Sequence, residues 1–249
     1  TLGQYDYVHV HYVEKPLQAL IDEFLDNIRG KIIVSVWGSD FLKRNDSDRN
    51  AIKKLFLHSY KIAFTSDKFK SEFCNYYNDN CIAKKTCSFK LGLEPLVFLD
   101  KVSRDDFNLN ITVGYNARHN QCHIEILESL RNLEVSKTNI QLLLPLTYPK
   151  DDLVYITKIK DCLNSLNFNF KTYETFMSDE NVARLRINTD IFIQLQKTDV
   201  LSGAMLEHIA AGSIVITGDW LPYDDLYNMG IELIRVSKRS DVGNKLQEV

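Results

Sequence analysis

The sequence predicts an α/β protein made of two doubly wound parallel-sheet domains. Short apolar runs rich in β-branched residues alternate with longer amphipathic runs along the chain, a pattern typical of strand–helix–strand units. The strand-like runs are apolar throughout, as buried parallel strands are. A stretch at residues 91–109 interrupts the alternation. A barrel of eight roughly equal units would have no such break, so two sheets joined by a linker are favoured.

The composition is that of an ordinary globular chain. The 249 residues include 30 Lys plus Arg and 33 Asp plus Glu, giving a net charge of −3, and 45% are hydrophobic. This apolar share excludes a disordered chain, and the charge balance argues against a broad basic surface for nucleic acid. Five cysteines without a CxxC pair argue against a zinc site or a disulfide framework. No apolar run of the sequence reaches transmembrane length, and we expect neither a membrane-spanning helix nor a signal peptide.

Residues 1–103 are expected to form the first domain together with the linker. Strands are predicted at 6–11, 31–36, 61–65 and 81–87, and helices at 15–28, 47–58 and 66–77. The apolar positions of 15–28 have the three-to-four spacing of an amphipathic helix. Asp46 or Ser47, and Ser66, stand where helix N-caps belong. Because the chain starts at Thr1 and a strand follows almost at once, we expect the natural N-terminus to be missing and this domain to be incomplete.

Residues 104–249 are expected to form the second domain. Its strands are predicted at 110–114, 139–144, 168–173, 190–195, 213–217 and 231–235, and its helices at 121–133, 151–166, 178–187, 201–211 and from 240 onward. The connections should be right-handed crossovers. Ligands of open parallel sheets bind at the carboxyl ends of the strands. The candidate site residues are therefore those that directly follow each strand.

The most informative segment begins at Asp199, where a predicted strand has just ended. A helix then opens, and Glu207 stands on it with seven residues between the two acids. The first amides of a helix suit a diphosphate, and here they belong to Ser202, Gly203, Ala204 and Met205. Glu207 lies roughly 7 Å further along at 1.5 Å per residue, where a carboxylate can accept the hydroxyls of a ribose. The alternative is an amphipathic helix whose glutamate faces water.

This segment resembles the acidic-x7-Glu region of retaining glycosyltransferases with the GT-B fold. The nearest likeness is to the nucleotide-sugar-dependent hexosyltransferases (glycosyltransferase family 4-like). Further segments resemble parts of that family in the same order, at residues 9–11, 36–41, 65–66, 92–98, 114–119 and 177–182. Residues 144–149 also resemble bacterial 4-acetamido-fucose transferases, and the choice between the two relatives stays open. The resemblance implies two Rossmann-like domains, the second of which binds the nucleotide sugar.

Several residues outside this helix are candidates for binding the donor. Arg118 stands where the resembling loop of the family lies, and the resemblance implies that it pairs with the diphosphate. Lys197 ends a predicted strand, where it could contact a phosphate. Thr147 and Tyr148 offer a pocket for base or ribose. Met177 and Ser178 resemble the loop before the family's base-contacting helix. The structural alternatives are a surface Arg or Lys, a Tyr-Pro turn, and a helix cap at Ser178.

Three residues are candidates for catalysis. The resemblance implies that Asp199 contacts the donor sugar, although the family has Glu at this position. Asp40 follows a predicted strand, where it could orient or deprotonate an acceptor hydroxyl, and otherwise it caps a loop. His11 ends a strand, where it could hydrogen-bond the transferred sugar, and otherwise it is structural.

The expected function is transfer of a sugar from a nucleotide-diphosphate donor to a glycan or lipid-linked acceptor. The family implies retention of configuration and a role in bacterial surface polysaccharides such as lipopolysaccharide or capsule. No DxD motif stands in a suitable loop, so protein groups are expected to neutralise the leaving diphosphate, with no metal and no cofactor. We expect a cytoplasmic protein without nucleic-acid partners. Lipid-linked acceptors are compatible with peripheral association at the inner face of the membrane. The alternatives are a nucleotide- or sugar-binding module without turnover and a nucleotide-sugar epimerase of the same fold.

Overall fold

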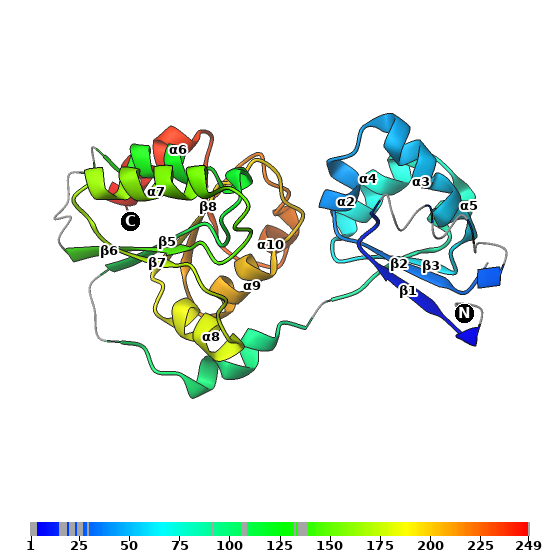
Figure 1. Cartoon of the computed structure of the whole chain (residues 1–249), viewed down its shortest axis with the longest axis horizontal. Coiled ribbons are helices and arrows are strands. Elements are labelled where there is room, and N and C mark those ends of the chain that lie inside the picture. The colour runs from blue at the N-terminus through cyan, green and yellow to red at the C-terminus, as the bar shows by residue number, and fades with distance from the viewer. Residues whose placement is uncertain are drawn as a thin grey trace. The chain divides into compact units, whose positions relative to one another are not determined.

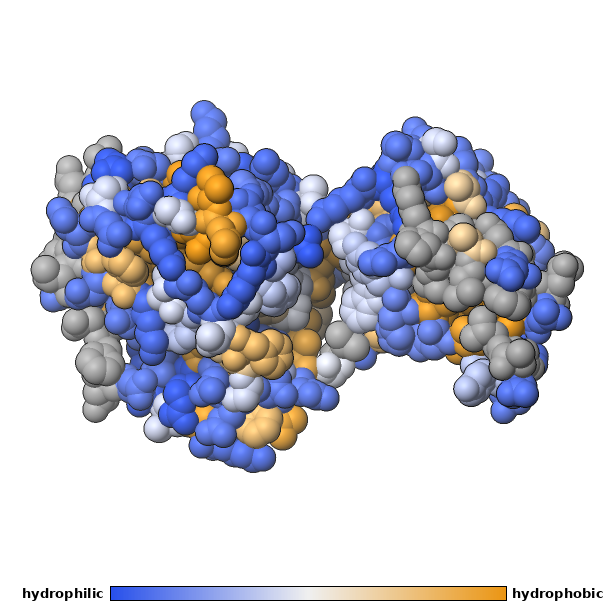
Figure 2. Space-filling view, viewed as in Figure 1, coloured by the Kyte–Doolittle hydropathy of each residue, from blue (hydrophilic) through white to orange (hydrophobic). Residues whose placement is uncertain are grey.

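The computed structural model describes residues 4–14, 19, 23, 27–28, 30–90, 92–105, 109–131, 133 and 139–248. The chain divides into two compact units, Thr1–Leu91 and Gly92–Val249. Each unit has its own parallel sheet (Figure 1), which confirms the predicted fold class. The helix predicted at 15–28 lies largely outside the described residues. On the visible face the surface is mainly hydrophilic, with small separate apolar patches (Figure 2).

The first unit holds a four-stranded parallel sheet in the order β1-β2-β3-β4. Its strands are β1 (Val8–His11), β2 (Ile32–Val36), β3 (Lys61–Phe64) and β4 (Thr86–Ser88), and its described helices are α2 (Ser39–Leu42), α3 (Asp46–His58), α4 (Asp67–Tyr77) and α5 (Asn80–Ala83). Aromatic rings fill the core. The ring centroid of Phe73 lies 4.9 Å from Phe56 and 5.0 Å from both Phe41 and Tyr77.

Side-chain caps fix where these helices begin. Ser66 caps α4, as predicted, by accepting the Phe69 amide at 3.3 Å. The cap of α3 is Asn45, and the prediction of Asp46 or Ser47 is wrong by one or two residues because Asn45 Oδ1 accepts the Asp48 amide. The strand predicted at 81–87 is wrong in its first half. There Asp79 caps the short helix α5.

The second unit holds a six-stranded parallel sheet in the order β10-β9-β8-β5-β6-β7. Its strands are β5 (Leu109–Val113), β6 (Ile140–Pro145), β7 (Asn169–Tyr173), β8 (Ile191–Gln194), β9 (Ile214–Gly218) and β10 (Ile234–Val236). Its helices are η2 (Glu94–Lys101), η3 (His119–Gln121), α6 (His123–Ser129), α7 (Leu153–Ser165), α8 (Asp179–Ile187), α9 (Gly203–Ala210), α10 (Asp224–Asn228), η5 (Arg239–Asp241) and α11 (Val242–Gln247). Helices α6 and α7 cover one face of the sheet, and α8 and α9 cover the other (Figure 1).

The order in which the chain adds strands to the sheet reverses between β5 and β8. From β5 the chain continues to β6 and β7 on one side, and from β8 it continues to β9 and β10 on the other. Val113 is paired with Ile193, so the loops after both strands start at the same edge. Such a switch point is where open parallel sheets bind their ligands. The fold therefore places the segments at 114–120 and 195–202 at a natural binding edge.

The linker belongs with the second unit. Residues 92–103 were expected to join the first domain, but the structure divides the chain after Leu91. The segment η2 packs against α8. In addition, Leu93 contacts the first turn of α9, where its Cδ2 lies 3.0 Å from the place a Cβ on Gly203 would take. These apolar contacts hold the linker in the second unit.

Candidate functional site

The loops that follow β5 and β8 are hydrogen-bonded to each other at the switch point. The Oε1 atom of Gln196 accepts hydrogen bonds from Asn120 Nδ2 at 3.1 Å and from Gln121 Nε2 at 2.8 Å. The backbone of Lys197 donates to the carbonyl of Asn120 at 2.9 Å. Buried Gln196 therefore fixes the two loops as one surface.

The loop after β6 joins the same surface. The amide of Ala117 donates to the carbonyl of Tyr148 at 2.7 Å. Arg118 and Tyr148 are both exposed and Thr147 is half-buried. The guanidinium of Arg118 makes no hydrogen bond or ion pair with another residue in the described ranges. The structure thus brings three predicted donor-binding residues from two strands to one edge.

Lys197 lies on that edge but also lines an open pocket of about 1020 Å³. The pocket walls include Trp220 and Lys238, which follow β9 and β10, and Glu125 of α6. Trp220 donates to the carbonyl of Gln196 at 3.0 Å. The exposed ammonium of Lys197 therefore belongs to the side of the edge where β9 and β10 end.

Asp199 holds the turn between β8 and α9. Its Oδ2 accepts the Ser202 amide at 3.1 Å, Gln194 Nε2 at 2.9 Å and the Tyr223 hydroxyl at 2.5 Å. Burial raises the pKa of Asp199, although these hydrogen bonds act in the opposite direction. Burial and the nearby carboxylate also raise the pKa of Tyr223, so its hydroxyl stays a donor. The expected contact of Asp199 with a donor sugar stays a prediction.

The first turn of α9 offers fewer free amides than the sequence suggested. Ser202 is the N-cap, and its Oγ accepts the Met205 amide at 3.2 Å. The Ser202 amide is itself held by Asp199. Of the four predicted amides, those of Gly203 and Ala204 have no hydrogen-bond partner among the residues described. An anion at this helix start would therefore meet two free donors.

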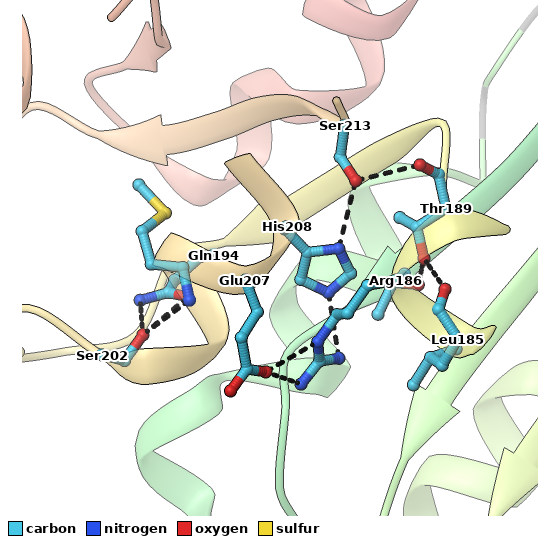
Figure 3. Close-up of polar contacts among 10 residues, drawn as sticks. Leu185, Arg186, Thr189, Gln194, Ser202, Glu207, His208 and Ser213 are labelled. Atoms are coloured by element: carbon cyan, nitrogen blue, oxygen red, sulfur yellow. Dashed lines mark hydrogen bonds and ion pairs between the residues drawn. The ribbon is translucent and has the colours of Figure 1, made fainter. Parts of the chain in front are cut away.

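Glu207 lies one turn further along α9 in a buried polar network (Figure 3). It is 7% exposed, and its Oε2 accepts Nε and Nη2 of Arg186 in α8, each at 3.0 Å. Nη1 of the same arginine contacts His208 Nε2 at 3.1 Å. On the far side of the ring, His208 Nδ1 lies 3.2 Å from Ser213 Oγ, which donates to the carbonyl of Thr189 at 2.9 Å. Sequence reasoning identified Glu207 but missed its partner Arg186.

Electrostatics fix the direction of these hydrogen bonds. Burial lowers the pKa of Arg186, and the attraction of Glu207 opposes this shift. Burial and the Arg186 cation hold the pKa of His208 well below its ordinary value. An arginine can only donate, so the neutral imidazole accepts at Nε2 and donates from Nδ1 to Ser213. The ring also stacks on Phe192 with a centroid distance of 3.9 Å.

The second carboxylate oxygen of Glu207 lies over the free helix start. A Cβ built on Gly203 would lie 3.7 Å from Oε1, and no contact of this atom with the residues drawn is marked in Figure 3. The side chain keeps 10% of its surface exposed. One acceptor oxygen and two free amides thus lie within the first turns of a single helix.

Met177 and Ser178 precede α8, the helix that carries Arg186. Ser178 is its N-cap, with Oγ 3.4 Å from the Asn181 amide, which is the structural alternative considered for this residue. Met177 is half-buried and Ser178 is exposed. A contact of either residue with a base stays a prediction.

Asp40, in the first unit, is 3% exposed. Its Oδ1 accepts the Trp37 amide at 2.9 Å and its Oδ2 accepts the Val13 amide at 3.1 Å. Burial raises its pKa, and these backbone hydrogen bonds counteract that rise. The carboxylate thus ties the loop after β1 to the loop after β2. This is the loop-stabilising alternative, and a role toward an acceptor stays a prediction.

His11 is exposed at the end of β1 in the same unit. Its ring centroid lies 3.9 Å from His9 and 6.2 Å from Trp37. Burial, and to a smaller extent the nearby His11, lowers the pKa of His9. The expected contact of His11 with a sugar stays a prediction.

The described residues contain neither a candidate metal site nor a candidate membrane-spanning helix. No group of three or more His, Cys, Asp or Glu side chains in the described ranges is arranged to hold a metal ion. No helix within those ranges has the length and apolar character needed to cross a membrane.

Comparison with known proteins gives a match in structure alone. No protein-family model matches the sequence, and no curated protein matches it either. A UDP-forming α,α-trehalose-phosphate synthase from Burkholderia xenovorans superposes with a TM-score of 0.74 at 11% identity, covering 98% of this chain and 65% of that chain. Sucrose-phosphate synthase from Thermosynechococcus elongatus gives 0.74 at 12% identity, over 98% and 64%.

The fold is the two-domain GT-B fold. A glycosyltransferase from Rickettsia africae supports this assignment with a TM-score of 0.72 at 13% identity, covering 99% of this chain and 67% of that chain. Both parallel sheets take part in the match, since each alignment covers nearly the whole chain. The chain spans about two thirds of the length of these GT-B structures.

Proposed function

We propose that this chain is the donor-binding part of a glycosyltransferase that uses a nucleoside-diphosphate sugar. The observation that carries the proposal is the first two turns of α9, where two amides without a hydrogen-bond partner among the described residues lie beside the Oε1 atom of Glu207. The amides suit a diphosphate, and the carboxylate oxygen suits ribose hydroxyls. The GT-B neighbours, which include a UDP-forming enzyme, support this assignment.

The proposed chemistry is stabilisation of the departing diphosphate. Charge develops on the leaving group as the bond to the sugar breaks, and preorganised donors stabilise that charge. The amides of Gly203 and Ala204 and the exposed guanidinium of Arg118 are the donors at this edge, and Lys197 supplies a second cation. In this proposal protein groups do this work without a metal, and transfer proceeds with retention.

The finer assignments rest on the resemblance of the sequence to GT-B glycosyltransferases and on the activities of the structural neighbours. We propose an acceptor that is a glycan or a lipid-linked sugar of bacterial surface polysaccharide synthesis, reached in the cytoplasm at the inner face of the membrane. A sugar phosphate is the competing acceptor class, since one neighbour from Burkholderia xenovorans, with a TM-score of 0.72, was solved in complex with glucose-6-phosphate. Product analysis with each acceptor class decides between them.

The test follows the amides of an isotope-labelled chain by NMR while UDP is added, and then GDP. The amides of Gly203 and Ala204 should shift most, and the Met205 amide should shift less because Ser202 already holds it. Large shifts confined to other parts of the chain would contradict the proposal. Release of free sugar, transfer to an acceptor or interconversion of nucleotide sugars would then separate a transferase from a binding module and from an epimerase.

A further inference from the structure

Arg186 is a buried cation directly behind the proposed ribose contact. It is 5% exposed, and three of its N–H groups are engaged within the second unit. A buried charge persists only where it is paired and hydrogen-bonded. The pairing partner here is Glu207, which the proposed function assigns to the ligand. The two roles of that carboxylate must therefore be divided between its oxygens.

The geometry makes this division. Each carboxylate oxygen has two acceptor positions. Both N–H groups that Arg186 directs to Glu207 end on Oε2, at 3.0 Å each, so the acceptor positions of this atom are used. Within the part of the chain that the structure describes, no donor contacts Oε1, which keeps both of its acceptor positions and lies over the first turn of α9. One oxygen thus serves the protein and the other is left for a ligand.

The arginine cannot easily turn to release this arrangement. Its third contact, to His208, is held by the chain of hydrogen bonds through Ser213 to the carbonyl of Thr189 (Figure 3). The imidazole is further fixed by stacking on Phe192 in β8. The guanidinium is therefore anchored to both the sheet and α9.

We propose that Arg186 is a positioning residue that reserves Oε1 of Glu207 for the two hydroxyls of a ribose, so that the site selects ribonucleotides over deoxyribonucleotides. The inference rests on the proposed function and adds the sugar selectivity of the site and the residue that sets it. A deoxyribose offers Oε1 one hydroxyl fewer. Loss of one hydrogen bond to a charged acceptor should weaken binding about tenfold or more.

The experiment compares affinities by titration calorimetry for UDP with dUDP and for GDP with dGDP. The unmodified chain should prefer the ribonucleotide about tenfold or more. In Arg186→Met the carboxylate is free to rotate and the preference should fall toward one. Arg186→Lys keeps the charge but not the planar pair of donors, and its preference should be intermediate. A general loss of structure would lower both affinities without changing their ratio.

The matched control is Arg184→Met on the same helix. Arg184 is half-buried and pairs with Glu180 at 3.3 Å within α8, so its loss should leave the ratio unchanged. Should Arg186→Met fail to fold, the ratio is taken from Arg186→Lys, which should show a reduced preference.

The outcomes separate the inference from the proposed function. Diphosphate binding by the unmodified chain without ribose preference overturns the inference and leaves the proposed function standing. A folded Arg186 variant whose ribonucleotide preference equals that of the unmodified chain also overturns the inference. Absence of binding for every diphosphate contradicts the proposed function, and the inference falls with it. A ratio that falls in the Arg186 variants and not in Arg184→Met supports it.

Discussion

Glu207 has a structural and a ligand-facing task in the same side chain. Replacing it with alanine leaves Arg186 buried without its counter-ion, and breaking a buried pair in this way typically costs about 3–5 kcal/mol. Glu207→Gln keeps the shape and one acceptor oxygen, so its cost in stability should be smaller. Both variants should bind nucleoside diphosphate more weakly, because a charged acceptor is lost.

Denaturant unfolding and calorimetry measure these two effects separately. We expect Glu207→Ala to be clearly less stable than Glu207→Gln, with the affinity for nucleoside diphosphate reduced in both. If Glu207→Ala is as stable as the unmodified chain, the ion pair with Arg186 does not contribute to the free energy of unfolding as expected.

Adding a single methyl group at Gly203 tests the proposed anion site at the start of α9. A Cβ there would lie 3.0 Å from Leu93 Cδ2 and 3.7 Å from Glu207 Oε1, within the space where an anion would meet the free amides. Gly203→Ala should reduce diphosphate affinity about tenfold. Its stability should change by less than about 1 kcal/mol, since the gain in helix propensity offsets the contact with Leu93. Gly92→Ala, with open space around its Cβ position, is the control that should change neither calorimetric affinity nor unfolding.

The turn between β8 and α9 carries a prediction about pH. Burial raises the pKa of Asp199 in the folded state, whereas an unfolded aspartate titrates near about 3.9. Between these two pKa values the folded state binds the proton more tightly, so the contribution of Asp199 to stability falls as pH rises. Asp199→Asn removes this titration. Its free energy of unfolding relative to the unmodified chain should therefore rise with pH from about 4 and level off above the folded pKa.

Unfolding curves of both proteins across this range provide the measurement. The relevant quantity is the difference between the two free energies at each pH, because other groups titrate equally in both. A difference that falls with rising pH would show that the donors from Ser202, Gln194 and Tyr223 stabilise the ionised carboxylate more than burial destabilises it.

Local pattern was sufficient to predict β8 and α9 but not the pair that joins α9 to α8. The strand was expected at 190–195 and the helix at 201–211, and they occupy Ile191–Gln194 and Gly203–Ala210. Arg184 and Arg186 stand in the same helix with similar sequence neighbours, yet one is half-buried beside Glu180 and the other is buried against α9. Burial of Arg186 depends on how the two helices pack, which no local spacing encodes.

At the scale of the molecule, the sheet order explains why loop residues far apart in sequence could be grouped in advance. Carboxyl ends of parallel strands share one edge, and this rule placed Arg118, Tyr148 and Lys197 together before their contacts were known. The rule says nothing of which amides or oxygens stay free. The Met205 amide is not free because it donates to Ser202 Oγ, and Asp40 is buried because it accepts amides from two loops. Both depend on hydrogen bonds that form only in the folded chain.

The second unit should fold and bind nucleotide by itself. Its apolar core and the whole network around Arg186 lie within Gly92–Val249. A fragment of residues 92–249 should unfold cooperatively and keep its diphosphate affinity within about threefold of the full chain, a difference of about 0.7 kcal/mol, since the proposed contacts all lie within it. A folded fragment that has lost all binding would place essential contacts in residues 1–91.

The proposed nucleoside-diphosphate site lies in the second unit, and we expect it to need no metal. The most direct measurement is calorimetric titration of the whole chain with UDP, GDP and dTDP, with and without a chelator. We expect saturable binding of UDP or GDP that the chelator leaves unchanged, and weaker binding of dTDP. Absence of saturable binding for all three, or binding abolished by the chelator, would contradict this expectation.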